Sequence, residues 1–223
     1  TMIIRKYGVT LHRLRREHIE LVRQKRNSED IRKYMFFREI ITSEMQKKWF
    51  ESIDNIYNYY FIIEFGGEFV GLINGKNLDF EKKTSEGGIF IWEPRHLNSY
   101  LPIMCSVMMA DVTFHVMGMH KTIAEILASN SRSLHYNKKL GYTIAQEDKS
   151  TGKIICELYR DNYEKFGGAV RKAIGRIGKD TSPCTWENIY VDQIDDAMRK
   201  RLYTNLPQQV QEGIDKKFEQ LQR

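Results

Sequence analysis

The segment from Arg95 to Tyr142 restricts the possible folds of this chain more than any other. A short polar turn opens it, and apolar residues then recur at spacings of three and four over residues 101–117, which predicts a buried helix. Residues 121–127 predict a strand, and residues 131–139 predict a second helix. Gly141 follows this helix and can adopt the left-handed conformation of a C-cap. A helix, a strand and a helix in this order favour a fold with a sheet and packed helices.

The residues before this segment predict an antiparallel meander. Tyr59–Phe65 is aromatic and β-branched, and Gly66-Gly67 can form a two-residue hairpin turn that leads into a returning strand over 68–74. Residues 77–80 continue the meander, and Glu86–Trp92 forms the next strand. We therefore expect three adjacent antiparallel strands before residue 95.

Shorter elements flank this meander. Residues 9–14 alternate as a half-buried strand does, and Ile19 and Val22 give a short helical stripe. Ser28 is the expected N-cap of a helix over 29–34, and Thr42 that of a helix reaching residue 53. Residues 142–147 and 153–159 predict a second hairpin.

The character of the chain changes after residue 160, so we expect a main domain over 1–160 and a helical extension over 161–223. In this extension strand signals disappear, and helices are predicted over 163–177, over 192–202 and after Asn205. The apolar residues available for docking the extension are Trp186, Ile189, Tyr190, Ile194, Met198 and Leu202. The extension is expected to pack on the domain, on itself or on a second subunit, where it would form a homodimer.

Composition excludes several classes of protein. The chain has 223 residues, 41% of them hydrophobic, and contains no apolar run long enough for a membrane span. No signal peptide is expected, and three cysteines argue against a disulfide framework, so we predict a cytoplasmic protein. The cysteines and the six scattered histidines suggest no metal site.

The net charge of +6 predicts attraction to anions. Many basic residues lie between Arg13 and Arg38, interleaved with acids. We favour a solvated helix face for them, and a pocket rim that attracts a phosphorylated ligand is the alternative. The bases do not interleave with aromatic residues as in a nucleic-acid-binding module, and a basic run over 171–179 has too few large apolar residues for membrane binding, so neither partner is expected.

The order of elements over 2–160, with Asn130 after the strand and Leu140-Gly141-Tyr142 at the end, resembles the GNAT (Gcn5-related) N-acetyltransferase family. The resemblance implies an α+β fold with a mixed, mainly antiparallel central sheet flanked by helices. It also implies acetyl transfer from acetyl-CoA to a primary amine of a small molecule. Arg26-Asn27 and the nearby Tyr34 are similar to an acceptor-site segment of two branches, the ribosomal-protein N-terminal acetyltransferases and the nucleotide-amino-sugar N-acetyltransferases. A nucleotide-linked amino sugar is therefore one expected acceptor.

The resemblance also implies where acetyl-CoA would bind. The family's loop for the CoA pyrophosphate aligns with residues 95–100, where Asn98 and Tyr100 replace glycines and Pro102 removes a donor. An Asn at position 130 contacts the pantetheine arm in the family, or caps the next helix. The family's general-acid Tyr aligns with Asn137, beside Tyr136. The cofactor-binding residues implied in this way are Phe90, Ile91, Trp92, Arg95, His96, Asn98, Ser99, Tyr100, Asn130 and Asn137.

The reaction needs a group that accepts a proton from the attacking amine, because only a neutral amine attacks. Glu86, near the start of a strand, is the first candidate, Glu64 is the second, and Tyr136 is a further catalytic candidate. Backbone N–H groups over 89–92 can polarise the thioester carbonyl. The alternative function is an inactive binding or assembly module, in which Tyr100 would fill the cleft beside Trp92.

Overall fold

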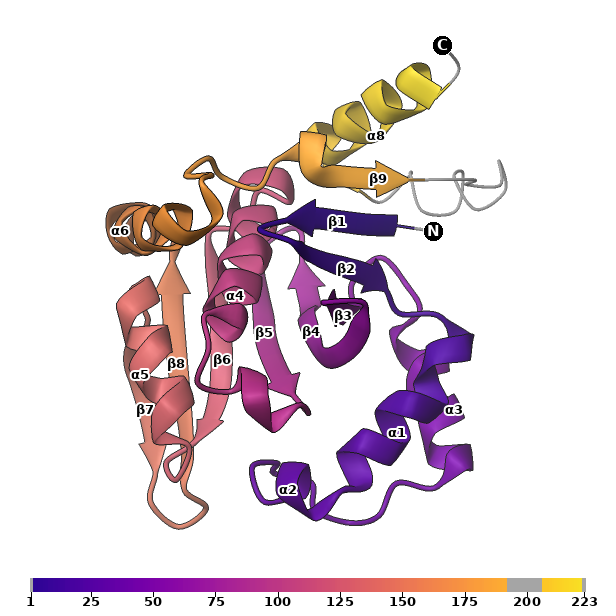
Figure 1. The fold of residues 1–223 in the computed structure, drawn as a ribbon, viewed down its shortest axis with the longest axis vertical. Helices are drawn as coiled ribbons and strands as arrows, with labels where there is room; N and C mark the ends of the chain where they lie inside the picture. The colour runs from indigo at the N-terminus through magenta and orange to yellow at the C-terminus, as the bar shows by residue number, and fades with distance from the viewer. Residues whose placement is uncertain (1, 192–205, 222–223) are drawn as a thin grey trace.

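The part of the chain that the structure describes forms one nine-stranded sheet at its centre (Figure 1). The computed structural model describes residues 2–191 and 206–221. The strands lie in the order β7-β8-β6-β5-β4-β3-β2-β1-β9, and within the described residues all neighbours are antiparallel except β5 and β6. Their bounds are β1 (Met2–Lys6), β2 (Val9–Arg13), β3 (Tyr59–Phe65), β4 (Glu68–Asp79), β5 (Thr84–Ile91), β6 (Lys121–Leu127), β7 (Thr143–Asp148), β8 (Lys153–Tyr159) and β9 (Ile189–Val191).

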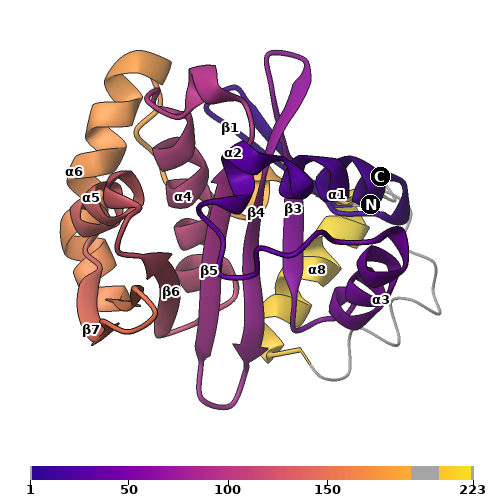
Figure 2. The same cartoon turned by 90° about the horizontal axis from the view of Figure 1, so that it is seen from below.

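Helices cover both faces of the sheet (Figure 2). They are α1 (Ile19–Asn27), α2 (Glu29–Arg32), α3 (Ser43–Ile53), α4 (Leu101–Asp111), α5 (Ser131–Leu140), α6 (Arg160–Gly178) and α8 (Gln208–Leu221). The helices α1 to α3 pack with Tyr60, Ile62 and Leu72 in one apolar cluster. The larger cluster joins α4, α6 and α8 to the opposite face of the sheet. Alternate residues of each central strand therefore belong to different cores.

The predicted α+β architecture and most of its elements are confirmed. The hairpin of β3 and β4 turns at Gly66 and Gly67, both with positive φ, and the predicted helix from residue 101 continues through α4 into one π-helical turn, Val112–Val116. Thr42 caps α3 as expected. Ser28 does not cap α2, because its hydroxyl donates to the carbonyl of Lys25 instead.

Two strands were not predicted. The apolar and polar residues of β1 do not alternate, and the three residues of β9 are too few to show a periodicity, but the two strands pair with each other over Met2–Ile4 and Ile189–Val191. The expectation that strands end before residue 160 is therefore wrong, although α6 and α8 keep the described extension mainly helical. The predicted helix over 192–202, with Ile194, Met198 and Leu202, lies outside the described residues.

The extension belongs to the main core. Tyr163, Ile174 and Ile189 are each at most 1% exposed within the larger cluster. Asp111 of α4 is fully buried and binds three groups of the extension: it accepts hydrogen bonds from the Tyr163 hydroxyl at 2.6 Å, from Arg171, and from the Cys184 amide at 2.8 Å. The division at residue 160 thus remains an expectation about domains, and a homodimer through this extension remains a prediction.

Gly141 ends α5 with a φ of 107°, as its position in the sequence predicts. A Cβ atom there would lie 2.9 Å from the carbonyl oxygen of Asn162, in addition to the cost of the left-handed conformation. We expect Gly141→Ala to lower the free energy of unfolding by about 1–3 kcal/mol, measured by urea denaturation. Gly168 of α6 is the matched control, because a Cβ there meets nothing within 4 Å, so Gly168→Ala should stabilise by about 0.5–1 kcal/mol. Equal effects of the two changes would contradict this account.

Candidate functional site

The strands β5 and β6 form a fork. Their parallel ladder has three residue pairs and ends at Glu86 and Ile123. Beyond it, Gly87–Ile91 stays paired with β4 on one side, while its other edge turns toward a cavity of about 780 Å³. The hydroxyl of Tyr142 lies at the branch point, 3.9 Å from where a Cβ on Gly87 would be. A strand edge with unused backbone groups therefore borders the cavity, and a ligand with amide groups can pair with it.

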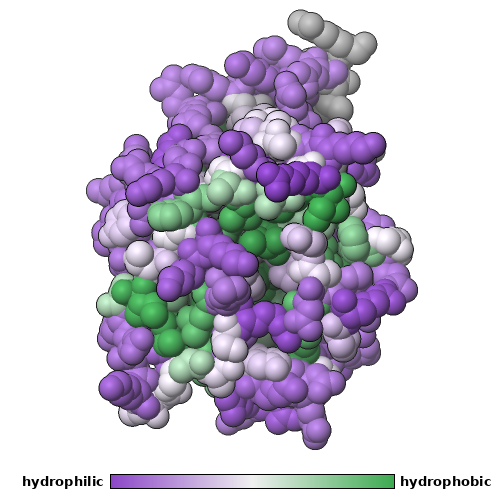
Figure 3. Space-filling view, turned by 60° about the vertical axis from the view of Figure 1, so that its left-hand side comes forward, coloured by the Kyte–Doolittle hydropathy of each residue, from purple (hydrophilic) through white to green (hydrophobic). Residues whose placement is uncertain are grey.

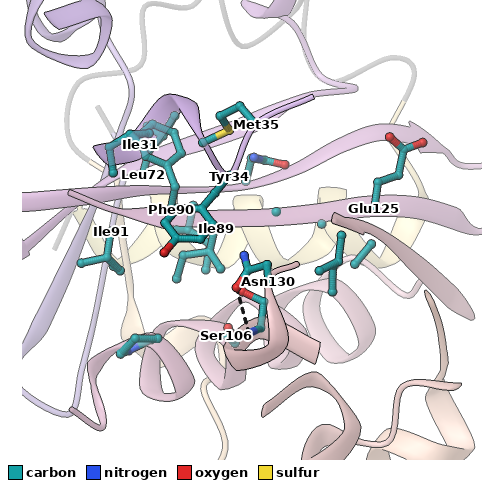
Figure 4. A pocket seen from close by; sticks show the side chains of 18 of the residues that line it. Ile31, Tyr34, Met35, Leu72, Ile89, Phe90, Ile91, Ser106, Glu125 and Asn130 are labelled. Carbon is teal, nitrogen blue, oxygen red and sulfur yellow. Dashed lines mark hydrogen bonds between the residues drawn. The ribbon is translucent and has the colours of Figure 1, made fainter. Parts of the chain in front are cut away.

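The cavity has two halves, one on each side of β5 (Figure 4). Ile31, Tyr34 and Met35 lie on one side, and Ser106 and Asn130 lie on the other. We call them the α1-side half and the α4-side half. The α1-side half also contains Arg26, Trp49, Tyr60, Leu72, Asn74, Phe90 and Trp92, and the α4-side half also contains Pro102, Met109, Ser133, Tyr136 and Asn137.

The structure brings eight of the predicted site residues to the cavity wall. They are Arg26, Tyr34, Phe90, Ile91, Trp92, Asn130, Tyr136 and Asn137. Asn130 was expected either to contact the cofactor or to cap the next helix. It lines the cavity, and its Oδ1 also accepts a hydrogen bond from the Ser133 amide at the start of α5. Asn137 is 9% exposed at the opposite end of that helix.

The two predicted carboxylates lie in different places. Glu64 is far along β3 from Tyr60 and forms a 2.6 Å contact with His12, away from the cavity wall. Glu86 is on the strand face that also carries Phe90, ion-paired to Lys76 at 3.7 Å, and its charge acts on Tyr60. The structure thus places Glu86, rather than Glu64, next to the α1-side half.

The loop over 94–100 differs from the expected phosphate loop. Some of its amides are used locally: those of His96, Leu97 and Ser99 donate to the carbonyls of Glu93, Pro94 and His96, and the Leu101 amide donates to the Ser99 hydroxyl. The Arg95 guanidinium binds Glu68, and Asn98 does not have a positive φ. His96 packs edge-on against Phe65.

Tyr100 does not fill the cleft. Its side chain is 55% exposed and is not part of the cavity wall, while Phe90 and Trp92 still border the open space. The expectation that Tyr100 blocks the cleft beside Trp92 is therefore wrong. The short 3₁₀ turn at 94–96 and the turns after it direct this residue outward.

Residues 33–41 form a strap over the α1-side half. Asn27 holds the strap, because its amide group donates to the carbonyl of Ile41 at 2.9 Å and accepts from the amide of Ile41 at 2.8 Å. Across the cavity, the Lys153 ammonium lies 5.7 Å from the Phe36 ring. The strap exposes several large apolar side chains, and the space-filling view shows apolar patches in an otherwise hydrophilic face (Figure 3). Asn27 thus positions the strap rather than pointing into the cavity.

Three tyrosines in the cavity wall have raised pKa values. Burial raises the pKa of Tyr60 to about 12, and the nearby charge of Arg26 opposes this shift. Burial also raises the pKa of Tyr136, against hydrogen bonds with Ser133 and Ser106, and that of Tyr142. All three hydroxyls are therefore protonated at neutral pH and can donate a hydrogen bond.

Sequence reasoning missed Tyr60, Asn74 and Tyr142. The Oδ1 atom of Asn74 is buried without a hydrogen-bond partner among the described residues, and Gly88 opposite leaves room for this amide. The alternation along each strand was a usable signal, since it places Tyr60, Asn74 and Phe90 on one sheet face once the register is known. The register itself could not be read from the sequence.

Neither a metal centre nor a membrane-spanning helix is found among the described residues. Residues 2–191 and 206–221 contain no group of three or more histidine, cysteine, aspartate or glutamate side chains arranged to hold a metal ion. In the same residues, none of the helices combines the length and apolarity that crossing a membrane requires.

Comparisons with known proteins agree with this architecture. The sequence model of the acetyltransferase (GNAT) domain matches residues 9–143. The chain is 23% identical to the spermidine N(1)-acetyltransferase of Escherichia coli K12 over 176 residues, which cover 75% of this chain and 86% of that protein.

Solved structures are similar in fold. One is a spermidine N-acetyltransferase from Vibrio cholerae in complex with CoA and spermine, with a TM-score of 0.63 and 16% identity, covering 71% of this chain and 99% of that one. Another is a domain from Methanocaldococcus jannaschii, with a TM-score of 0.59 and 22% identity, covering 68% of this chain and 97% of that one.

Proposed function

Because the chain belongs to the GNAT acetyltransferase family, we propose that it is an N-acetyltransferase that moves acetyl from acetyl-CoA to a primary amine of a small molecule. The fork between β5 and β6 carries this proposal, because it leaves the edge of Gly87–Ile91 open beside a large cavity. A thioester arm that contains amides can pair with such an edge as an added strand does. The acceptor then enters from the other side of β5.

The α4-side half fits the acetyl-CoA arm. Pro102, Met109 and Ile89 give it an apolar wall, and Asn130 and Ser106 add polar groups. Acetyl-CoA supplies an acetyl thioester to the reaction. The Arg95 guanidinium and the amides of His96, Leu97 and Ser99 are already bound within the protein, so we assign the binding of the acetyl-CoA phosphates partly to Arg132, an exposed arginine of the cavity rim without a partner among the described residues. This replaces the glycine-rich loop that the family commonly uses.

The α1-side half fits the acceptor amine. Asn74 Oδ1 can accept a hydrogen bond from this amine, which would satisfy an otherwise unpaired buried atom. Glu86 takes up the proton that the amine loses, directly or through water near Tyr60. Tyr142 and Tyr136 are the protonated hydroxyls of the α4-side half that can donate to the leaving thiolate.

Two acceptor classes follow from similarity. Two of the similar proteins reported above, those from Escherichia coli and Vibrio cholerae, are named for spermidine, which makes a polyamine one candidate. The Arg26-Asn27 segment makes a nucleotide-linked amino sugar the other. The finer assignment to the ribosomal-protein or amino-sugar branch stays a prediction.

The test combines binding with a matched pair of variants. We expect calorimetric titration to show that the protein binds acetyl-CoA, and Glu86→Gln to lower kcat for amine acetylation by about 10²–10⁴ while acetyl-CoA affinity is kept. Glu157→Gln is the control: like Glu86, Glu157 is a partly exposed strand glutamate paired with a lysine, at 3.4 Å from Lys121, but it lies on β8, which β6 separates from β5. Absence of acetyl-CoA binding at millimolar concentration would refute the proposed function, and equal activity of the two variants would refute the role of Glu86.

A further inference from the structure

Arg26 is a cation in the cavity wall that lacks an anionic partner among the residues the structure describes. It lies in the last turn of α1, with its guanidinium 5.7 Å from the centre of the Phe90 ring. Burial lowers the pKa of Arg26, and Tyr60 opposes the shift, but a guanidinium remains charged at neutral pH. A partly buried charge of this kind is costly unless a counter-ion or hydrogen-bond acceptor reaches it.

The acids of the cavity wall, Asp30 and Glu125, and the nearby Glu86 are already paired with other cations. Asp30 lies 3.7 Å from Lys33, and Glu125 lies 3.0 Å from Lys153. Glu86, next to the α1-side half, lies 3.7 Å from Lys76. Among the described residues of the cavity wall, the charges outside these pairs are those of Arg26 and Arg132, and both are positive.

The two arginines belong to different halves. Arg132 follows Asn130 at the start of α5, in the half assigned to acetyl-CoA. Arg26 lies beside Phe90 and Tyr60, in the half assigned to the acceptor. The counter-ion of Arg26 is therefore expected from the acceptor.

We propose that the acceptor is an amine that also carries an anionic group, a carboxylate or a phosphate, which Arg26 binds while the amine lies at the fork. This inference rests on the proposed function and specifies its substrate class. A planar guanidinium can hold either anion through two parallel hydrogen bonds, which fixes the orientation of the acceptor as well as its affinity. A purely cationic polyamine would instead meet an unpaired positive charge in the same half of the cavity.

The first experiment compares amines that differ only in the anionic group. Suitable pairs are ethanolamine with O-phosphoethanolamine, glucosamine with glucosamine 6-phosphate, and butylamine with 4-aminobutyrate. Spermidine is included as a purely cationic amine. Binding to the CoA-saturated protein is measured by calorimetry, so that the CoA phosphate site is occupied and no turnover is needed. We expect the anionic member of at least one pair to bind ten-fold or more tightly than its neutral counterpart. Comparing the phosphate-bearing amines with the carboxylate-bearing amine then shows which of the two anionic groups the protein binds.

The second experiment assigns the effect to Arg26. Arg26→Gln should remove the preference for the anionic amine and raise the Kd of this amine at least ten-fold in the same titration, with the Kd for CoA unchanged. Arg26→Lys, which keeps the charge without the planar fork, should retain part of the preference. Lys25→Gln is the control, because it removes the same charge from the adjacent position of α1, outside the cavity wall.

Three results would overturn the inference. They are equal binding of both members of every pair, tighter binding of spermidine than of every anionic amine, and an undiminished preference in Arg26→Gln. Failure of the proposed function has a different signature, because it appears in the acetyl-CoA titration, while the comparison of anions by wild type and Arg26→Gln needs no acetyl transfer.

Discussion

A chain that ends at residue 160 is expected not to fold stably. The truncation removes Tyr163, Ile174, Ile189 and Val210, each at most 3% exposed, from the main core. Burial of one such side chain contributes about 1.5–3 kcal/mol, so the loss is comparable to the whole net stability of a domain, about 5–15 kcal/mol. We expect the truncated chain to lack a cooperative thermal transition in circular dichroism.

A less severe truncation is the control for this experiment. A chain that ends at residue 191 keeps α6 and β9 and loses Leu206 and Val210 from the core. It should unfold cooperatively at a lower temperature than the full chain. If the chain ending at 160 instead melts within a few degrees of the full protein, the extension is a separate module, as the division of the sequence at residue 160 would suggest.

Asp111 is expected to be the most sensitive single position outside the cavity. Its replacement by Asn leaves the Arg171 guanidinium, 13% exposed, without its ion pair and weakens the bonds from Tyr163 and Cys184. Removing one partner of a buried ion pair costs about 3–5 kcal/mol. We expect Asp111→Asn to lower the free energy of unfolding by this amount in urea denaturation.

A double-mutant cycle separates the ion pair from general packing damage. Replacing Asp111 by Leu and Arg171 by Met together leaves no unpaired charge. The free energy of unfolding should therefore fall less in the double variant than the sum of the falls in the two single variants. Asp161→Asn, at an exposed position in the first turn of α6, should cost less than about 1 kcal/mol. Additive effects of Asp111→Leu and Arg171→Met would show that the ion pair contributes little.

Periodicity was sufficient to predict most of the fold. The aromatic and β-branched runs became β3 and β4, the apolar stripe after residue 101 became α4, and Gly141 became the left-handed cap. These features depend on neighbours in the chain. The strands β1 and β9 depend on a partner at the opposite end of the sequence. The residues of β1 do not alternate, and the three residues of β9 are too few to show a pattern.

The candidate site was predicted only in part, for a related reason. Four of the predicted residues line the cavity: Phe90, Trp92, Asn130 and Tyr136. Each lies on or directly beside a strand or helix that was predicted from the sequence. The separation of β5 from β6 depends on where their ladder ends, which the residue types do not reveal. The direction of Tyr100 likewise follows from hydrogen bonds within its loop rather than from the size of its side chain.

The pairing of β1 with β9 has a consequence for synthesis on the ribosome. β1 is translated just before β2 and can pair with it early, but the strand that covers its outer edge is translated only after α6. At about 5–20 residues per second, this edge stays open for roughly 10–40 s in the growing chain. An uncovered strand edge can recruit strands of other chains. Nascent chains that stall before β9 is made should therefore be the ones most dependent on chaperones.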